Sequence, residues 1–229
     1  MAIDILAIGA HPDDIEIGAA GSIIKHVSQG KRITLCDLTY AELSSNGDVT
    51  TRQKEALLAA ERMGNLTRIN LGMADRHIEC SEQNIRSLVE VIRKEQPKMI
   101  LAPYWQDRHP DHVHCSELVQ EAAFSAGIRK YAPDTGNAHK VSSIYFYFIN
   151  DFVEPDFCID ISDHYDQKIE ALKAYESQFL PSVGGVETPL NTGYFETVRS
   201  REYLFGRKIG AVYAEGFKSR TPISIETFC

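Results

Sequence analysis

Residues 3–14 read Ile-Asp-Ile-Leu-Ala-Ile-Gly-Ala-His-Pro-Asp-Asp, and this stretch decides the fold. Apart from Asp4, residues 3–8 are apolar, three of them are β-branched, and the run stops at Gly9, which is typical of a buried strand. A polar turn with one histidine and two aspartates follows directly. We therefore take this stretch as the first strand of the protein and the start of a candidate site.

After this strand, helical and strand patterns alternate along the chain. Residues 19–29 and 81–96 have apolar residues at helical spacing, and residues 51–63 are rich in the strong helix formers Ala, Leu and Glu. Ser81 is an expected N-cap, and Gly30 and Pro97 are expected to follow helix ends. Up to residue 126 the expected helices are 19–29, 51–63, 81–96 and 111–126, and the expected strands are 33–38, 68–71 and 99–102. This βαβαβαβα order predicts an α/β, Rossmann-like three-layer fold with a mostly parallel sheet and right-handed crossovers.

The second half of the chain is less regular. We expect strands at 142–149 and 157–161, helices at 166–179 and 199–206, and a loop at 181–193. The loop contains three glycines and two prolines, and its length suits a lid or a subunit contact.

Composition limits the class of protein. At 229 residues one domain, 1–229, is expected. The formal net charge of −8 and the lack of a compact basic run argue against nucleic-acid binding. No signal peptide pattern and no membrane-spanning apolar run is present. The five cysteines are scattered and form no C-x-x-C pair, as expected in a reducing compartment. A soluble cytoplasmic protein without membrane partners is predicted.

Two clusters of histidine and aspartate follow two of the expected strands. Residues 10–14, Ala-His-Pro-Asp-Asp, follow the first strand, and residues 108–112, Arg-His-Pro-Asp-His, follow the fourth. In a doubly wound sheet these two strands are often neighbours at the topological switch point, and ligands bind outside their carboxyl ends. The clusters are therefore expected to face each other across one crevice.

The residue types in these clusters suit a catalytic metal. His11, Asp14 and His112 supply two imidazoles and a carboxylate, which is a set that binds zinc and leaves one position open. Asp13 then stands beside the metal as a base for water, whose pKa the metal lowers to about 7. A protonated His109 is expected to hydrogen-bond the developing oxyanion.

The same residues are also compatible with iron binding and with purely structural roles. Two histidines and a carboxylate also describe the Fe(II) facial triad, although that triad gives Asp13 no role. His11 could be a hydrogen-bonded strand-end histidine, and Asp13, Asp14 and Asp111 could be helix caps. A dinucleotide site is disfavoured because the first turn lacks G-x-G-x-x-G.

The two motifs together resemble the LmbE/PIG-L family of zinc-dependent N-acetylglucosaminyl deacetylases. The resemblance implies zinc bound by His11, Asp14 and His112, Asp13 as the general base that later protonates the leaving amine, and His109 as the charged group beside the tetrahedral intermediate. Further segments resemble the bacterial deacetylases of bacillithiol biosynthesis, which act on N-acetylglucosaminyl malate. These segments are residues 39–47, 51–55, 75–76, 125–131 and 213–217.

The malate aglycone implied by this resemblance carries two carboxylates, which an acidic chain would hold with arginines. Arg52 and Arg108 are the candidates, and surface positions are the alternative for both. Asp75 and Arg76 follow the third strand and are expected to contact sugar hydroxyls. Tyr194 is expected either to donate to the oxyanion or to pack within its loop.

The substrate, the metal and the oligomeric state stay open in the sequence. Free N-acetylglucosamine and short chitooligosaccharides require the same catalytic residues, and a metal-containing sensor of an acetylated sugar is a non-enzymatic alternative, although it has no need of Asp13. Fe²⁺ is the alternative to Zn²⁺ as the cofactor in the cell. The family resemblance favours a homo-oligomer, for which the aromatic residues 145–148 and the loop after Pro181 are candidate contacts.

Overall fold

The first strand lies at the centre of the sheet, as expected of a fully buried apolar segment. In the computed structural model, which describes residues 2–180 and 184–224, β1 (Ile5–Gly9) is buried along its whole length. It pairs in parallel with β2 (Ile33–Thr39) on one side and with β4 (Met99–Pro103) on the other. The carboxyl ends of β1 and β4 are therefore neighbours, as the sequence predicted.

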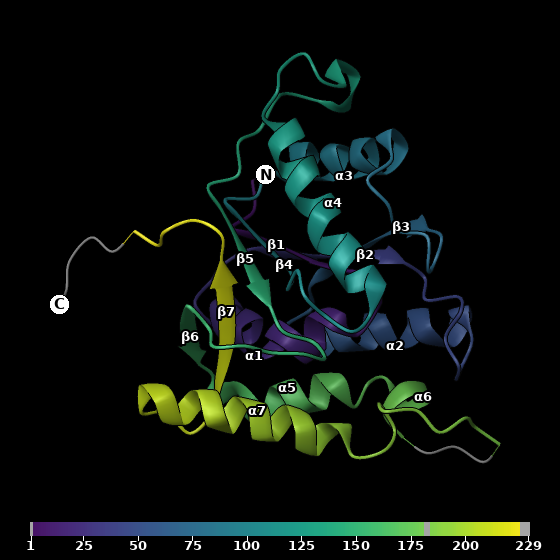
Figure 1. The fold of residues 1–229 in the computed structure, drawn as a ribbon, viewed down its shortest axis with the longest axis vertical. Helices are drawn as coiled ribbons and strands as arrows, with labels where there is room; N and C mark the ends of the chain where they lie inside the picture. Colours follow the sequence, from purple (N-terminus) through teal and green to yellow (C-terminus); the bar gives the residue numbers. More distant parts are fainter. Residues whose placement is uncertain (1, 181–183, 225–229) are drawn as a thin grey trace.

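Within residues 2–180 and 184–224 the sheet has seven strands, in the order β3-β2-β1-β4-β5-β7-β6 (Figure 1). The outer strands are β3 (Thr67–Met73), β5 (Ser143–Tyr147), β6 (Phe157–Asp160) and β7 (Ala214–Ser219). β7 runs antiparallel to both β5 and β6, whereas the other neighbouring pairs are parallel. The prediction of a mostly parallel α/β sheet is confirmed. β7 was not predicted, because Ala-Glu-Gly at its start has low strand propensity.

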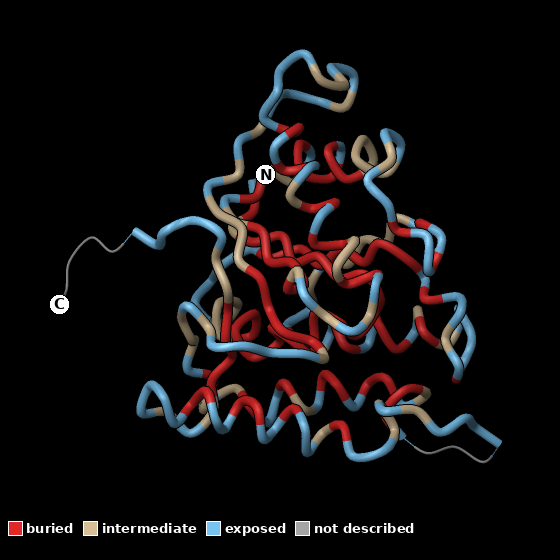
Figure 2. The backbone as a smooth tube through the Cα atoms, in the orientation of Figure 1, coloured by how far each residue is buried: buried red, intermediate tan, exposed pale blue. Residues whose placement is uncertain are grey.

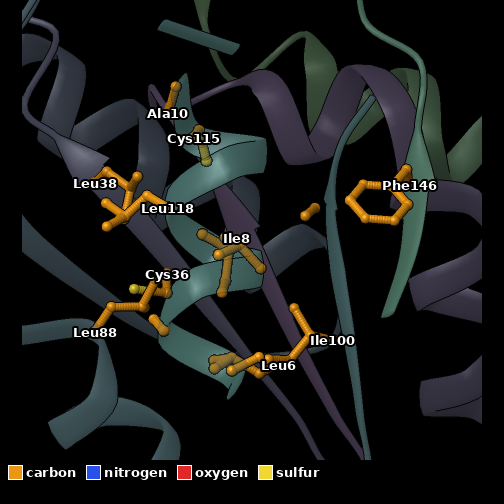
Figure 3. Close-up of a cluster of buried hydrophobic side chains, with 14 of the residues drawn as sticks. Leu6, Ile8, Ala10, Cys36, Leu38, Leu88, Ile100, Cys115, Leu118 and Phe146 are labelled. Atoms are coloured by element: carbon orange, nitrogen blue, oxygen red, sulfur yellow. The ribbon is translucent and has the colours of Figure 1, made fainter. Parts of the chain in front are cut away.

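Helices cover both faces of this sheet (Figures 1 and 2). One face packs against α3 (Glu82–Glu95) and α4 (Pro110–Ala126) in a core that includes Leu6, Ile8 and Ile100 (Figure 3). The second core contains residues of the remaining helices. These are α1 (Asp14–Ser28), α2 (Val49–Arg62), α5 (Tyr165–Leu172), α6 (Glu176–Phe179) and α7 (Tyr194–Ile209). Short 3-10 turns lie at Pro133–Thr135 and Ser162–His164.

Close packing of α1 depends on two glycines. A Cβ at Gly18 would lie 2.1 Å from a ring carbon of Tyr147, and a Cβ at Gly21 would lie 2.7 Å from a methyl of Ile161. Both contacts are shorter than side chains tolerate, so α1 approaches the sheet and its neighbours only because these positions carry no side chain.

Several helix boundaries differ from the expected ones. α1 begins at Asp14 rather than at residue 19, so the aspartate motif itself forms the first helical turn. The expected helix 166–179 is interrupted between Leu172 and Glu176, and α7 begins at Tyr194 rather than at residue 199. Ser81 is the N-cap of α3 as expected, since its side chain accepts a hydrogen bond from the amide of Asn84.

The described helices include none long and apolar enough to cross a membrane. Part of the expected lid or contact loop, residues 181–183, lies outside the described residues.

Candidate active site

A pocket of about 340 Å³ opens where β1 and β4 end. It brings together the two histidine and aspartate clusters, which are a hundred residues apart in the chain. Its remaining walls come from the segments after β2, β3 and β5 and from residues 188–190. The lining includes nine of the ten predicted site residues, which are His11, Asp13, Asp14, Arg52, Asp75, Arg76, Arg108, His109 and His112.

Asp14 lies between the two histidines predicted as metal ligands. Its Oδ2 is 3.5 Å from Nδ1 of His11, and its Oδ1 is 3.1 Å from Nε2 of His112. All three residues are buried. Two imidazoles and a carboxylate that converge in this way match the donor set of a catalytic zinc site.

The second nitrogen of each histidine faces another carboxylate. Nε2 of His11 is 3.2 Å from Oδ1 of Asp75, and Nδ1 of His112 is 3.0 Å from Oδ1 of Asp107. Metal-binding histidines commonly use such an outer carboxylate to fix the ring and its tautomer. The carboxylate of Asp75, which the sequence predicted to contact the sugar, is therefore hydrogen-bonded to His11 and to the amide of Leu43.

The negative charge of the carboxylates around His11 and His112 also favours the binding of a cation. Although burial opposes protonation, the neighbouring carboxylates raise the pKa of His112 to about 9 and that of His11 well above its usual value. Protons thus compensate the carboxylates where a divalent cation would bind, and metal binding releases such protons. Among the described residues, two further sets of possible metal ligands lie in this pocket, and within each set the ligand atoms are within 4.8 Å of one another. One set is His11, His109 and His112, and the other is His11, Asp75 and Asp111.

Asp13 is the N-cap residue of α1, but its side chain does not cap the helix. Its φ angle of 121° is unfavourable for a residue with a Cβ, and such strain is frequent at functional sites. Burial raises the pKa of its carboxyl to about 7, against the lowering effect of the Arg52 charge. A carboxyl that titrates near neutrality is suited to general acid–base catalysis.

Arg52 lines the pocket, but its guanidinium binds neighbouring groups of the protein itself. Its Nη2 donates to Oδ2 of Asp13 and its Nε to the carbonyl of Pro12, both at 2.8 Å. The side chain is buried. The structure therefore favours a role for Arg52 in holding Asp13 over the expected contact with substrate carboxylates.

His109 stacks on His112 with ring centroids 4.7 Å apart and caps α4. Its Nδ1 accepts a hydrogen bond from the amide of Asp111, which corrects the expectation that Asp111 is the cap. Burial and the charges of His112 and His11 lower the pKa of His109 to about 4. The structure therefore favours a neutral ring over the expected imidazolium, and because Nδ1 accepts, Nε2–H is the donor.

The other predicted site residues differ in their access to the pocket. Arg76 and Arg108 are exposed and line it; Arg76 contacts Asp111 at 3.4 Å, and Arg108 donates to the side chain of Asn150 at 3.0 Å. Tyr194 is buried outside the lining, and its hydroxyl donates to the carbonyl of Ile149 at 3.0 Å. The structure thus does not bring Tyr194 to the expected oxyanion.

Comparison with known proteins identifies the family of this chain. The model of the PIG-L family, described as GlcNAc-PI de-N-acetylase, matches residues 6–123, which include both clusters. The chain belongs to the PIG-L family. The diacetylchitobiose deacetylase of Thermococcus kodakarensis is 30% identical over 228 residues, covering 93% of this chain and 82% of that protein. The Probable N-acetyl-alpha-D-glucosaminyl L-malate deacetylase 2 of Bacillus subtilis is 28% identical, covering 76% and 82%.

A solved structure has the same fold. The conserved protein TT1542 from Thermus thermophilus superimposes with a TM-score of 0.90 at 30% identity, covering 99% of both chains. The predicted family, fold class and reaction class, a hydrolase of an N-acetyl amide, are confirmed.

Some residues of this PIG-L site were missed in the sequence. Asp107 comes directly before the second motif, and its position there is a signal that could have identified it. Asn150 follows the aromatic strand, and its amide and side chain donate to Asp107 at 3.0 and 2.9 Å. Gln178 and Leu190 line the pocket from segments that carry no motif, and Ser44 lines it from the segment 39–47, in which the sequence assigned no role to any single residue.

Proposed function

We propose that this chain is a zinc-dependent deacetylase that hydrolyses the acetamide of an N-acetylglucosaminyl conjugate. The observation that carries the proposal is that Asp14 lies between His11 and His112 while Asp13, bound to Arg52, stands beside them in the same pocket. A ligand set and a separate carboxyl with a pKa near 7 are the two parts that amide hydrolysis needs.

Each part then has a role. Bound zinc would polarise the acetamide carbonyl and lower the pKa of a water molecule to about 7. Asp13 accepts the proton of the attacking water and returns it to the amine as the C–N bond breaks. Nε2–H of His109 donates to the negative charge that develops on the acetamide oxygen. Arg52 keeps the Asp13 carboxyl in place and partly ionised at neutral pH.

The substrate that we propose is N-acetylglucosaminyl L-malate, converted to glucosaminyl malate and acetate in bacillithiol biosynthesis. Support comes from the segments that resemble those deacetylases and from relatives named for this substrate in Bacillus subtilis and Bacillus anthracis. The exposed guanidinium groups of Arg76 and Arg108 on the pocket wall suit the two malate carboxylates.

A chitooligosaccharide or free N-acetylglucosamine is the second candidate substrate. It is favoured by the higher identity of the diacetylchitobiose deacetylase, 30%, than of the malate deacetylases, 24% and 28%. A sensor that does not turn over its ligand is disfavoured, because it would not need the strained and buried Asp13. A cytoplasmic location and a homo-oligomer stay predictions.

The test is amine release from N-acetylglucosaminyl malate, diacetylchitobiose and N-acetylglucosamine, measured on metal-free protein before and after addition of Zn²⁺ or Fe²⁺. Zinc-restored turnover with a large preference for the malate conjugate is the expected result. Equal rates on all three substrates would retain the chemistry and reject the malate assignment. Absence of release from all three substrates with zinc bound would reject the proposed substrate and favour a different acyl substrate or a sensor.

Three variants test the roles in the same assay. Asp13→Asn should bind zinc but lose most turnover, and His112→Ala should lose both zinc and turnover. Arg108→Gln should raise KM for the malate conjugate while leaving KM for N-acetylglucosamine unchanged, because the neutral sugar has no carboxylate for the guanidinium. An equal rise in KM for both substrates would contradict recognition of the aglycone by Arg108.

A further inference from the structure

The segment that follows β5 holds the outer partner of a predicted metal ligand. Asn150 donates from its amide and its side chain to Asp107, whose Oδ1 lies 3.0 Å from Nδ1 of His112. Ile149 and Asn150 also line the pocket. The position of this segment therefore affects the orientation of the His112 ring.

Two side chains of α7 bind the carbonyl of Ile149. The hydroxyl of Tyr194 donates to it at 3.0 Å and Nη1 of Arg201 at 2.8 Å. Tyr194 and Arg201 are seven residues apart, so they lie two turns apart on one face of the helix. Both are buried, with exposed fractions of 6% and 5%. The carbonyl of Ile149 is thus fixed from α7 by two independent donors.

Arg201 also binds a second segment that lines the pocket, in α1. Its Nη2 donates to the carbonyl of Ile17 in α1 at 2.9 Å, while Nη1 also contacts the carbonyl of Phe148 at 3.1 Å. Ile17 follows Asp13 and Asp14 by one helical turn and lines the pocket. One planar guanidinium therefore connects the helix that carries Asp14 to the segment that holds the partner of His112.

We propose that Arg201, assisted by Tyr194, is a positioning residue that sets the separation of Asp14 and His112. The proposal rests on the proposed function, in which these two residues bind zinc. A guanidinium has donors that diverge from a rigid plane, so it can serve Ile17 and Ile149 at once. A lysine at this position keeps the charge but offers one nitrogen, which cannot occupy both places.

A buried arginine elsewhere provides a matched control. Arg93 is 3% exposed and donates to several carbonyls near the ends of α3 and α4, including those of Ala126, Ile128 and Ala132. It does not line the pocket. Arg93→Lys therefore reproduces the loss of a buried arginine bound to carbonyls without affecting either wall of the site.

The experiment compares Arg201→Lys with Arg93→Lys in the full chain. Zn²⁺ affinity of the metal-free protein is measured by chelator competition, thermal unfolding reports stability, and kcat and KM are measured on the zinc-loaded enzyme. We expect Arg201→Lys to lose up to about 10-fold in zinc affinity, less than the 10- to 100-fold found for direct outer partners of metal ligands, because Arg201 acts through backbone carbonyls; kcat should fall with little change in KM. Arg93→Lys should lose stability alone.

Equal zinc affinities in the two variants would overturn the proposal, even if both were less stable than the wild type. A wild-type protein that binds zinc but releases no amine would refute the proposed function, and the affinity comparison would still decide the role of Arg201. A wild-type protein that does not bind zinc would refute both.

Tyr194 requires its own variant because the sequence predicted a different role for it. As a positioning residue, Tyr194→Phe should lower zinc affinity slightly in the wild type and more strongly when Arg201 is already lysine, since the two donors share one acceptor. A donor to the oxyanion would instead lose about 10²- to 10³-fold in kcat at unchanged zinc affinity. The second outcome would remove Tyr194 from the proposal.

Discussion

Replacing Arg52 with glutamine removes the positive charge that the structure places 2.8 Å from the carboxylate of Asp13. That charge stabilises the ionised form of Asp13 and so lowers its pKa; without it, the pKa must rise. The base is active when it is ionised. The acid limb of the pH profile of Arg52→Gln should therefore move to higher pH, and turnover at neutral pH should fall.

The size of the shift follows from the geometry. Two unit charges with centres roughly 4 Å apart interact by about 4 kcal/mol at an effective dielectric constant of about 20, which corresponds to about three pKa units. Water that enters the pocket screens the pair, so a shift of about one to two units is the working expectation. From a starting pKa of about 7, Asp13 would then be mostly protonated at pH 7. Because Asp13 is about half ionised at that pH in the wild type, turnover should fall by about 5- to 50-fold.

The assay is kcat and KM from pH 5 to 10 for the zinc-loaded wild type, Arg52→Lys and Arg52→Gln, with Asp13→Asn as the reference without a base. Arg52→Gln should recover turnover as the pH rises, Arg52→Lys should lie between it and the wild type, and Asp13→Asn should not recover. An increase in KM for the malate conjugate alone, with kcat and the acid limb unchanged, would refute the reasoning. That result would return Arg52 to the role in substrate binding that the sequence suggested.

Three further predictions concern the metal site and the fold. Asp107→Asn should weaken zinc binding by about 10- to 100-fold in chelator competition, because His112 loses its anionic partner. Gly18→Ala should lower the free energy of unfolding by about 1–3 kcal/mol in urea titrations, because its Cβ would lie 2.1 Å from a buried tyrosine ring; an unchanged midpoint would show that the ring can move. The hydrogen bond from Lys98 lowers the pKa of Asp4 to about 2. The stability that this carboxylate contributes is therefore complete above about pH 4 and is lost as the pH falls towards 2. The free energies of unfolding of Asp4→Asn and the wild type should differ at pH 6 and converge near pH 2.

The central part of the site could be predicted because it depends on local motifs and on topology. His11 and His112 each follow a parallel strand, and the carboxyl ends of neighbouring parallel strands meet at one edge of the sheet. Strand order was enough to bring the two motifs together without knowledge of any side-chain conformation. The order of the first eight elements could be predicted as well, because strand and helix patterns alternate up to residue 126.

The partners of these residues could not be predicted in the same way. The pairing of Arg52 with Asp13 joins positions 39 residues apart, and it depends on the approach of α2 to the strained turn after β1. The carbonyl of Ile149, which Tyr194 binds, is a backbone group that no motif marks. β7 was missed for a related reason, since it is stabilised by pairing with strands on both sides and not by its own propensity.

The charge balance of the site gives a reason for the carboxylates that surround the two histidines. Five carboxylates lie in or beside the pocket, and they belong to Asp13, Asp14, Asp75, Asp107 and Asp111. Arg52 compensates Asp13 and the exposed Arg76 contacts Asp111, but all four carboxylates other than that of Asp13 surround two imidazoles that are neutral when they bind a metal. Buried negative charge of this kind is costly unless a cation compensates it. The same carboxylates that orient the histidines therefore also make the pocket a site for a divalent cation, and an anionic substrate would have to approach through the exposed arginines at the rim, Arg76 and Arg108.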